Sequence, residues 1–132
     1  MELFYVGIAP RDEKSSATLK SRIDKNHLGG NTGSSTFRFT LAALLMDPLE
    51  LMPERTKTNY VLSTSQNQNL TAWQRQHLKL SWVGHDQPWL IEDGVIEALS
   101  PPLNLAGNKS HPFHPTLSHA RAKFRNAARP RT

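Results

Sequence analysis

The sequence contains no cysteine. This absence excludes disulfide frameworks, thiolate metal sites and thiol catalysis, and it fits a reducing compartment. Long apolar runs are missing as well, because the longest, residues 41–46, falls far short of the roughly 20 residues that span a bilayer. The first residues also lack the basic and apolar regions of a signal peptide. We therefore expect a soluble, cytoplasmic protein that does not enter membranes.

Acidic residues are missing from the last quarter of the chain. Residues 1–97 hold 10 Lys/Arg and 11 Asp/Glu, whereas residues 98–132 hold six Lys/Arg and no acid. A basic segment of this kind gains affinity for phosphate groups by releasing counterions. Its composition fits a phosphate-binding arm and a solvated helix or frayed end equally well. We divide the chain into a domain over residues 1–112 and a basic tail or helix over residues 113–132.

The hydrophobic pattern predicts several helices and few strands. Residues 3–8 are predicted to form a buried strand and residues 78–83 another, while residues 60–62 are short enough to be a weak strand or no strand at all. Helices are predicted over residues 17–27, from a cap at Ser34, Ser35 or Thr36 to Leu45, then over 71–77, about 89–99 and 120–129. Glycines between residues 29 and 33 are predicted to end the first helix through positive φ angles, and residues 63–69 to form a loop. The predicted class is α/β or α+β, with a small mixed or antiparallel sheet of about three strands flanked by helices.

Three motifs combine residue types that suit phosphodiester hydrolysis. In chain order they are Tyr5-Val6-Gly7; Leu19 and Arg22 with His27 five residues later; and Glu92, with Asn104 twelve residues later and the run Asn108-Lys109-Ser110-His111-Pro112 beyond it. A carboxylate such as Glu92 is a hard oxygen ligand for Mg²⁺. The guanidinium of Arg22 matches a phosphate group through two parallel hydrogen bonds. Tyr5, close to cations, is predicted to have a lowered pKa and to take a proton from water.

The order and spacing of these motifs resemble the GIY-YIG nuclease family. The resemblance covers about residues 3–112. It implies a GIY-YIG-like fold and a metal-dependent endonuclease that hydrolyses DNA, with Mg²⁺ or Mn²⁺ as cofactor. Low sequence specificity is expected because we see no attached domain that would read a long DNA site. The implied roles are base or water-positioner for Tyr5, phosphate clamp for Arg22, metal ligand for Glu92, and support for His27 and Asn104. The interval to Asn104 selects Glu92 rather than Glu97 as the ligand.

Without the family pattern, the same residues have ordinary structural interpretations. Tyr5 would be a core residue of an apolar strand, and His27 a helix-terminal histidine favoured by the helix dipole. Arg22 and Glu92 would belong to solvated helix faces. Contacts with the DNA backbone are predicted for a set of basic residues in the domain and in the tail: Arg11, Lys20, Lys109, Arg121, Lys123 and Arg125.

The sequence departs from the family pattern at its start. The family has an earlier strand with a Gly-[Ile/Val]-Tyr signature, whereas only four residues precede Tyr5. That strand is therefore expected to be missing, which would leave residues 3–8 as an exposed edge that favours homo-oligomers. Ile8 stands where the family often has lysine, and Arg11 is the candidate to replace it. Two alternatives follow: a catalytically degenerate nucleic-acid-binding domain, or a protein-interaction module that uses the exposed edge strand.

Overall fold

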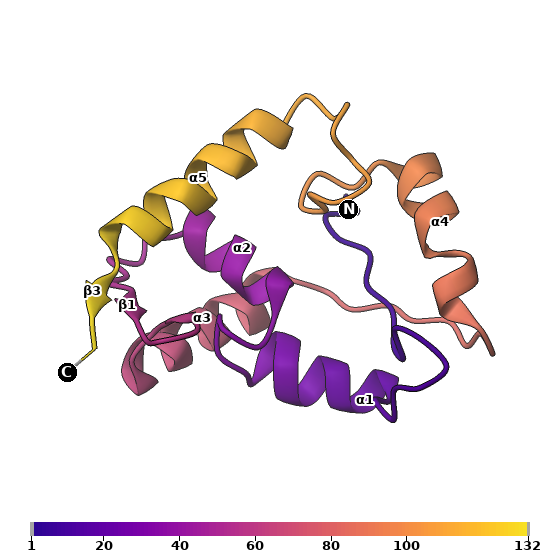
Figure 1. Ribbon diagram of the computed structural model, residues 1–132, viewed down its shortest axis with the longest axis horizontal. Coiled ribbons are helices and arrows are strands. Elements are labelled where there is room, and N and C mark those ends of the chain that lie inside the picture. Colours follow the sequence, from indigo (N-terminus) through magenta and orange to yellow (C-terminus); the bar gives the residue numbers. More distant parts are fainter. Residues whose placement is uncertain (1, 132) are drawn as a thin grey trace.

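Helices are the main regular structure of the chain, which a computed structural model describes for residues 2–131 (Figure 1). The elements are α1 (Leu19–Ser21), η1 (Arg22–Leu28), α2 (Thr36–Leu44), β1 (Glu54–Arg55), β2 (Tyr60–Val61), α3 (Thr64–His77), η2 (Pro88–Leu90), α4 (Glu92–Leu99), α5 (His114–Ala127) and β3 (Arg129–Pro130). Within these residues, three short strands form a sheet in the order β2-β1-β3, with β1 antiparallel to β2 and parallel to β3. The predicted α+β class with a small mixed sheet is confirmed.

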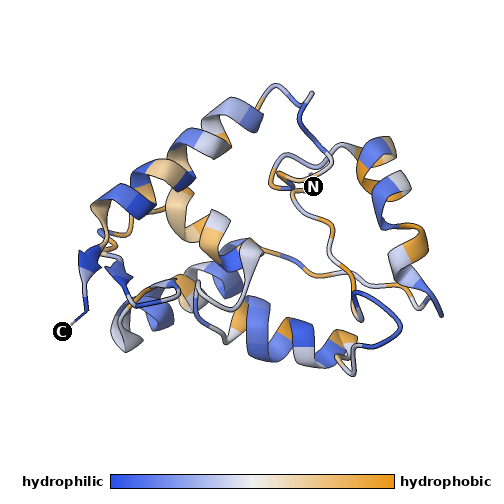
Figure 2. Cartoon of the chain, in the orientation of Figure 1, coloured by the Kyte–Doolittle hydropathy of each residue, from blue (hydrophilic) through white to orange (hydrophobic). Residues whose placement is uncertain are grey.

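The hydrophobic core lies where α2 packs against α5 and α3. Ser35 caps α2 by accepting a hydrogen bond from the N–H of Arg38, as the sequence allowed. Phe39 and Ala42 of α2 are buried against Phe124 of α5. Figure 2 shows hydrophobic residues concentrated in α2 and in the stretch of α5 beside it. The basic segment at the end of the chain is thus a helix that closes the core.

Arg38 is a fully buried cation between α2 and α3. Its guanidinium donates five hydrogen bonds, all to neutral acceptors: the carbonyl oxygens of Leu28 and Asn67 at 2.9 and 2.8 Å, and side-chain oxygens of Thr71, Gln74 and Asn67 at 3.0, 2.6 and 3.2 Å. Burial lowers the pKa of Arg38 to about 10, so the group stays charged near neutral pH. These bonds join α3 and the end of η1 to α2.

Helix α3 begins earlier than predicted. Residues 63–69 were predicted to be a loop and Thr71 a helix cap, but Ser63 caps the helix and accepts the N–H of Gln66. The side of α3 that faces Arg38 carries Asn67, Thr71 and Gln74, which are spaced as on one face of a helix. Because this inward stripe is polar, the hydrophobic pattern did not reveal it.

Two predicted strands are extended segments outside the sheet. Residues 3–8 are half-exposed rather than buried, and they pair with a loop described below. Residues 78–83 are extended and largely exposed, with Trp82 at 69% of its maximal accessibility. The three strands form instead at β1, β2 and β3, and of these only β2 falls within a predicted segment.

The glycines after η1 act through close packing. A positive φ was predicted to end this helix, but Gly29 has a φ of −109°. A Cβ atom at Gly29 would lie 2.5 Å from the carbonyl oxygen of Asp24, and one at Gly30 would lie 2.6 Å from that of Asn26. Side chains are excluded here because the chain turns tightly against the last carbonyl groups of η1.

None of the helices within residues 2–131 has both the length and the apolar character needed to cross a bilayer.

Replacing Arg38 with methionine should lower the free energy of unfolding by roughly 3 kcal/mol or more, because several buried acceptors lose their donor. Urea denaturation followed by circular dichroism measures this change. Arg75→Met, at an exposed position of α3, is the matched control and should change stability by less than about 0.5 kcal/mol. Similar losses in the two variants would show that the buried network does not stabilise the fold.

Candidate active site

The Tyr5-Val6-Gly7 segment is held by the loop that follows α4. The N–H of Leu103 donates to the carbonyl oxygen of Phe4 at 2.8 Å. The buried side chain of Asn104 accepts the N–H of Val6 at 2.8 Å and donates to its carbonyl oxygen at 2.9 Å. One amide side chain thus takes the place of a neighbouring strand. The predicted open edge is closed on the side to which Val6 points its backbone groups.

A second buried asparagine fixes this loop. Ser100 ends α4 in a left-handed conformation, with φ of 44°, and its hydroxyl donates to Asn108 Oδ1 at 3.1 Å. Asn108 Nδ2 donates to the carbonyl oxygens of Pro101 at 2.8 Å and Asn104 at 3.2 Å. In Figure 1 the loop lies beside the N-terminal segment. The loop therefore connects the helix that carries Glu92 to the segment that carries Tyr5.

Tyr5 packs into a small aromatic cluster. Its ring lies 4.8 Å from the ring of Phe37 and 6.0 Å from that of His27, measured between centroids. Side chains two residues apart in an extended segment point to the same side. A Cβ atom at Gly7 would lie only 3.0 Å from Cε1 of Tyr5. Glycine at this position therefore leaves room for the tyrosine ring.

His27 connects the cluster to the start of α2. Its Nδ1 lies 2.7 Å from the hydroxyl oxygen of Ser35, which is buried. Burial, reinforced by the positive charge of Arg22, lowers the pKa of His27 to about 4. The imidazole is therefore neutral near pH 7, and its hydrogen bond with the Ser35 hydroxyl fixes the orientation of the ring.

Arg22, at the start of η1, influences the other ionisable groups of the site. Burial raises the pKa of Tyr5, the positive charge of Arg22 lowers it, and the negative charge of Glu92 raises it. The net pKa of Tyr5 is raised, so the predicted lowering is wrong: the loss of hydration outweighs the attraction of the cation. The charge of Arg22 thus acts on the pKa of both Tyr5 and Glu92.

Glu92 lies in the first turn of α4 and is partly exposed. Burial raises its pKa, as does the neighbouring Asp93, while Arg22 acts in the opposite direction. Among the described residues, no ion pair within 4.0 Å neutralises this carboxylate. The carboxylate of Glu92 therefore has no Lys, Arg or His of the described chain as a close partner.

The donor set of the site fits a metal ion that keeps most of its water. In the described part of the chain, no three His, Cys, Asp or Glu side chains gather closely enough to hold a metal by themselves. Mg²⁺ is commonly held by one or two carboxylates, together with water and substrate phosphate oxygens. A single carboxylate at Glu92 meets that requirement, whereas a closed structural metal site would need more ligands.

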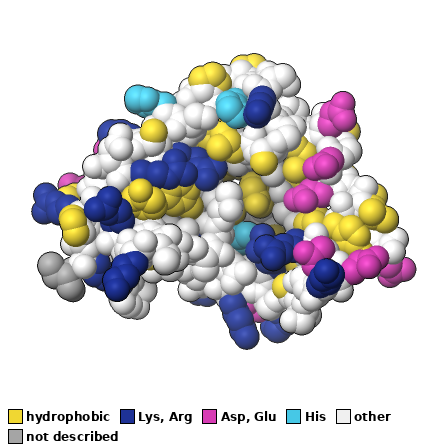
Figure 3. Space-filling model, in the orientation of Figure 1, with side chains coloured by type: hydrophobic (Ala, Val, Ile, Leu, Met, Phe, Trp, Pro, Cys, Tyr) yellow, Lys and Arg dark blue, Asp and Glu magenta, His cyan; other side chains and the backbone are white. Residues whose placement is uncertain are grey.

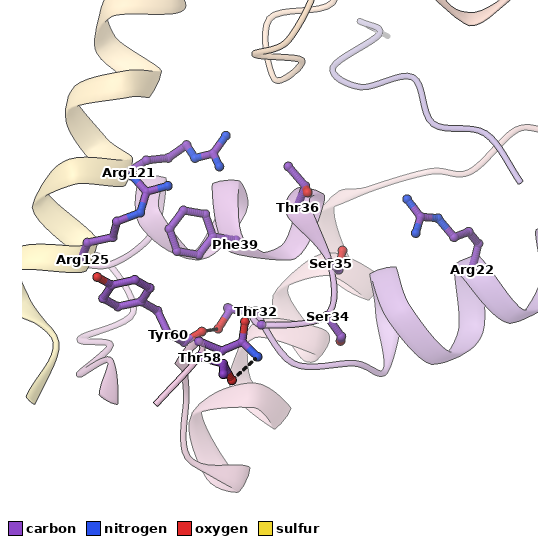
Figure 4. Close-up of a pocket in the computed structure, with 12 residues that line it drawn as sticks. Arg22, Thr32, Ser34, Ser35, Thr36, Phe39, Thr58, Tyr60, Arg121 and Arg125 are labelled. Carbon is purple, nitrogen blue, oxygen red and sulfur yellow. Dashed lines mark hydrogen bonds between the residues drawn. The ribbon is translucent and has the colours of Figure 1, made fainter. Parts of the chain in front are cut away.

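The predicted DNA-binding residues separate into two groups. Arg121 and Arg125 lie on α5 and line one pocket together with Arg22 (Figure 4). The remaining four are exposed. Three of them lie beside a carboxylate: Arg11 with Asp12 at 3.5 Å, Lys20 with Asp24 at 3.1 Å, and Lys123 with Asp47 at 2.6 Å. The fourth, Lys109, lies in the loop after α4. Figure 3 shows Lys and Arg side chains lying over a hydrophobic surface near α5, with Asp and Glu gathered on the side of α4.

Sequence reasoning missed three residues that build the site. Ser35 was considered only as a helix cap, Phe37 only as part of a helix face, and Asn108 only as part of a motif. The spacing of Asn108 from Asn104 and Ser100, in a loop with two prolines, is the signal that could have indicated a polar loop network.

A family model described as the GIY-YIG catalytic domain matches residues 1–123. The chain belongs to the GIY-YIG family. Searches among curated proteins and among solved structures gave no significant match. The family consists of nucleases that act on nucleic acids and generally use divalent metal ions, so this GIY-YIG domain is a nuclease-family protein. The matched region includes all five predicted catalytic residues and most of α5.

The low pKa of His27 predicts a pH dependence of stability in this GIY-YIG domain. The unfolded chain takes up a proton on His27 below its ordinary pKa of 6.5, whereas the folded chain does so only near pH 4. The free energy of unfolding should therefore fall as the pH drops from 6.5 towards 4, by about 1–2 kcal/mol after allowance for solvent screening. Urea denaturation across this range, compared with His27→Gln, isolates the contribution. Parallel pH profiles for the two proteins would contradict it.

Asn104→Ala removes both bonds that hold Val6. The N–H of Val6 should then exchange with solvent on the order of tenfold faster, because a typical hydrogen bond contributes about 1 kcal/mol. Hydrogen exchange measured by NMR at this amide tests the expectation. Asn126→Ala, at an exposed position of α5, serves as the control and should leave the rate unchanged. An unchanged rate in Asn104→Ala would show that the side chain does not hold the segment.

Proposed function

We propose that this GIY-YIG domain is a metal-dependent endonuclease that hydrolyses DNA phosphodiester bonds with low sequence specificity. The observation that supports the proposal is that the charge of Arg22 acts on the pKa of both Tyr5 and Glu92, although the three residues come from separate segments. Phosphodiester hydrolysis needs a positioned water molecule, positive charge for the phosphate oxygens and a cation for the leaving oxygen. These three residues supply groups of the required kinds.

Arg22 is the proposed phosphate clamp. Its Nε is buried and has no hydrogen-bond partner within residues 2–131. A guanidinium stays charged at any working pH and donates parallel hydrogen bonds that match two phosphate oxygens. The Arg22 side chain donates no hydrogen bond within the described residues, so its terminal nitrogens could donate to an arriving phosphate group.

Tyr5 is the proposed water-positioner. Because its pKa is raised, the phenol keeps its proton near neutral pH and acts as a hydrogen-bonding hydroxyl rather than as a general base. Asn104 and Gly7 support this role, since one holds the backbone at Val6 and the other leaves space for the ring. His27 packs against the edge of that ring and restricts its movement.

Glu92 is the proposed ligand of Mg²⁺ or Mn²⁺. When bound, such an ion supplies positive charge to the phosphate and lowers the pKa of coordinated water. Low sequence specificity is proposed because the arginines gathered near the site suit phosphate oxygens, and contacts with phosphates carry no direct base information.

A catalytically degenerate DNA-binding domain is the second candidate. The raised pKa of Tyr5 favours this candidate, because a protonated phenol cannot act as a base. Ile8 favours it as well, because it replaces the lysine that the family often has at this position. This candidate shares the phosphate-binding arginines but predicts no turnover.

Glu92→Gln should reduce metal-dependent DNA cleavage by at least about 100-fold, because even changes beyond the metal's direct ligands typically cost ~10–100-fold. Cleavage of single- and double-stranded DNA is measured with and without Mg²⁺ or Mn²⁺. Glu97→Gln makes the same charge change on the same helix and should leave cleavage unchanged. Full activity in Glu92→Gln would refute the assignment of the ligand. Unchanged DNA binding, without cleavage by the wild-type protein, would favour the second candidate.

A further inference from the structure

A pocket of about 400 Å³ lies between η1, α2, α5 and the residues of β2 (Figure 4). Its charged lining residues are three arginines, Arg22, Arg121 and Arg125, and no acidic residue lines it. Hydroxyl groups of Ser34 and Thr36 add polar lining at the start of α2. Tyr5, Glu92 and Asn104 do not line this pocket, so it extends beyond the site described above.

Two of the arginines are held side by side on one aromatic ring. The guanidinium carbons of Arg121 and Arg125 each lie 4.9 Å from the ring centroid of Phe39. The two residues are one helical turn apart, a spacing at which like charges repel. Burial and the charge of Arg125 both lower the pKa of Arg121. Stacking on Phe39 offsets part of this repulsion and fixes the guanidinium groups over the ring.

Neither arginine is neutralised by the protein. Within the described chain, no carboxylate lies within 4.0 Å of Arg121 or Arg125. The Nε of Arg121 is buried and has no hydrogen-bond partner among the same residues. Lys123, between them in the sequence, points elsewhere and pairs with Asp47 at 2.6 Å. The acids of the fold thus neutralise the neighbouring lysine and leave the arginine pair unmatched.

The start of α2 adds further donors to the pocket. The first N–H groups of a helix have no intrahelical acceptors, and the Ser35 side chain satisfies only that of Arg38. The N–H groups of Thr36 and Phe37 belong to this first turn of a nine-residue helix. In Figure 4 Arg22 points from η1 towards the same end of α2. A helix N-terminus with flanking arginines favours an anion with several oxygens.

We propose that this pocket binds a second phosphate group of the DNA, separate from the phosphate at Tyr5 and Glu92. This inference rests on the proposed function, since it takes DNA as the ligand. Arg22 lines the pocket and also influences Tyr5 and Glu92, so one DNA strand can run from the pocket to the site of hydrolysis. The planar forks of Arg121 and Arg125 suit phosphate oxygens better than a point charge does.

Inorganic phosphate tests the pocket without DNA or cleavage. Phosphate should raise the Tm of the wild-type protein more than sodium chloride does at equal ionic strength. The Arg121→Gln/Arg125→Gln variant should lose more than half of this difference. Lys79→Gln removes one charge at an exposed position outside the pocket and should keep the full effect. Equal phosphate effects in all three proteins would reflect general salt exclusion and would overturn the proposal.

Salt-dependent DNA binding in EDTA is the second test. The double variant should bind DNA on the order of tenfold more weakly. The slope of the logarithm of the binding constant against the logarithm of salt concentration should become less steep by about 0.9 for duplex DNA, or by ~0.7 for a single strand. This change corresponds to one lost phosphate contact. The single variant Arg125→Gln is the control for a packing defect, because this position is exposed. Its DNA affinity and its salt dependence should change in the same direction as in the double variant. Affinity and salt dependence equal to those of Lys79→Gln would contradict the proposal.

The two proposals fail separately. If the wild-type protein binds phosphate through Arg121 and Arg125 but cleaves no DNA in any metal, the pocket stands and the nuclease proposal fails. If cleavage depends on Glu92 while the arginine variants do not change the phosphate and salt measurements, the nuclease proposal stands and the pocket proposal fails.

Discussion

The position of the site depends on the buried guanidinium of Arg38. A buried cation without a carboxylate partner needs polar acceptors, and here the two terminal nitrogens of the guanidinium donate to carbonyl and amide oxygens of α3 and of the end of η1, while Nε has no partner among the described residues. The last carbonyl groups of η1 are the negative end of that helix, so they attract the charge. Because η1 carries both Arg22 and His27, fixing its end also fixes two residues of the site. Three residues before Arg38, Ser35 both begins α2 and contacts His27, which places the aromatic cluster beside the same network.

On the opposite side of the site, too, side-chain hydrogen bonds take the place of regular secondary structure. Tyr5 lies in an extended segment without a partner strand, and the amide of Asn104 supplies the two backbone hydrogen bonds that such a strand would make. Asn108 in turn holds the loop that carries Asn104. Buried amides with both ends satisfied restrict a loop to few conformations. A site assembled from distant segments gains from this restriction, since its groups must already be in place when the phosphate arrives.

These side-chain hydrogen bonds also explain how much of the fold and of the candidate site the sequence could predict. The amphipathic pattern and the serine cap predicted α2 closely. The roles of Tyr5, Arg22, Glu92 and Asn104 stay predictions, although Asn104 does hold the segment of Tyr5 and the charge of Arg22 acts on the pKa of both Tyr5 and Glu92. The pattern failed for α3, because the face turned towards Arg38 is polar. It also failed for the pKa of Tyr5, because burial results from packing against Phe37 and His27, which no local spacing reveals. The stacking of Arg121 and Arg125 on Phe39 joins residues about eighty positions apart and likewise lies beyond local patterns.

The distribution of charge gives the site and the pocket different tasks. Near neutral pH Tyr5 and His27 are both uncharged, because burial disfavours the phenolate and the imidazolium alike. The ionisable pair that remains at the site is Arg22 and Glu92, whose charges oppose each other. The α5 pocket, by contrast, adds two unmatched positive charges and a helix N-terminus. We therefore expect a phosphate backbone to be attracted more strongly to the pocket than to the residues around Tyr5. Binding energy would come from the pocket, while the nearly neutral site leaves Glu92 available for a cation, so that attraction and chemistry are assigned to different residues with Arg22 shared between them.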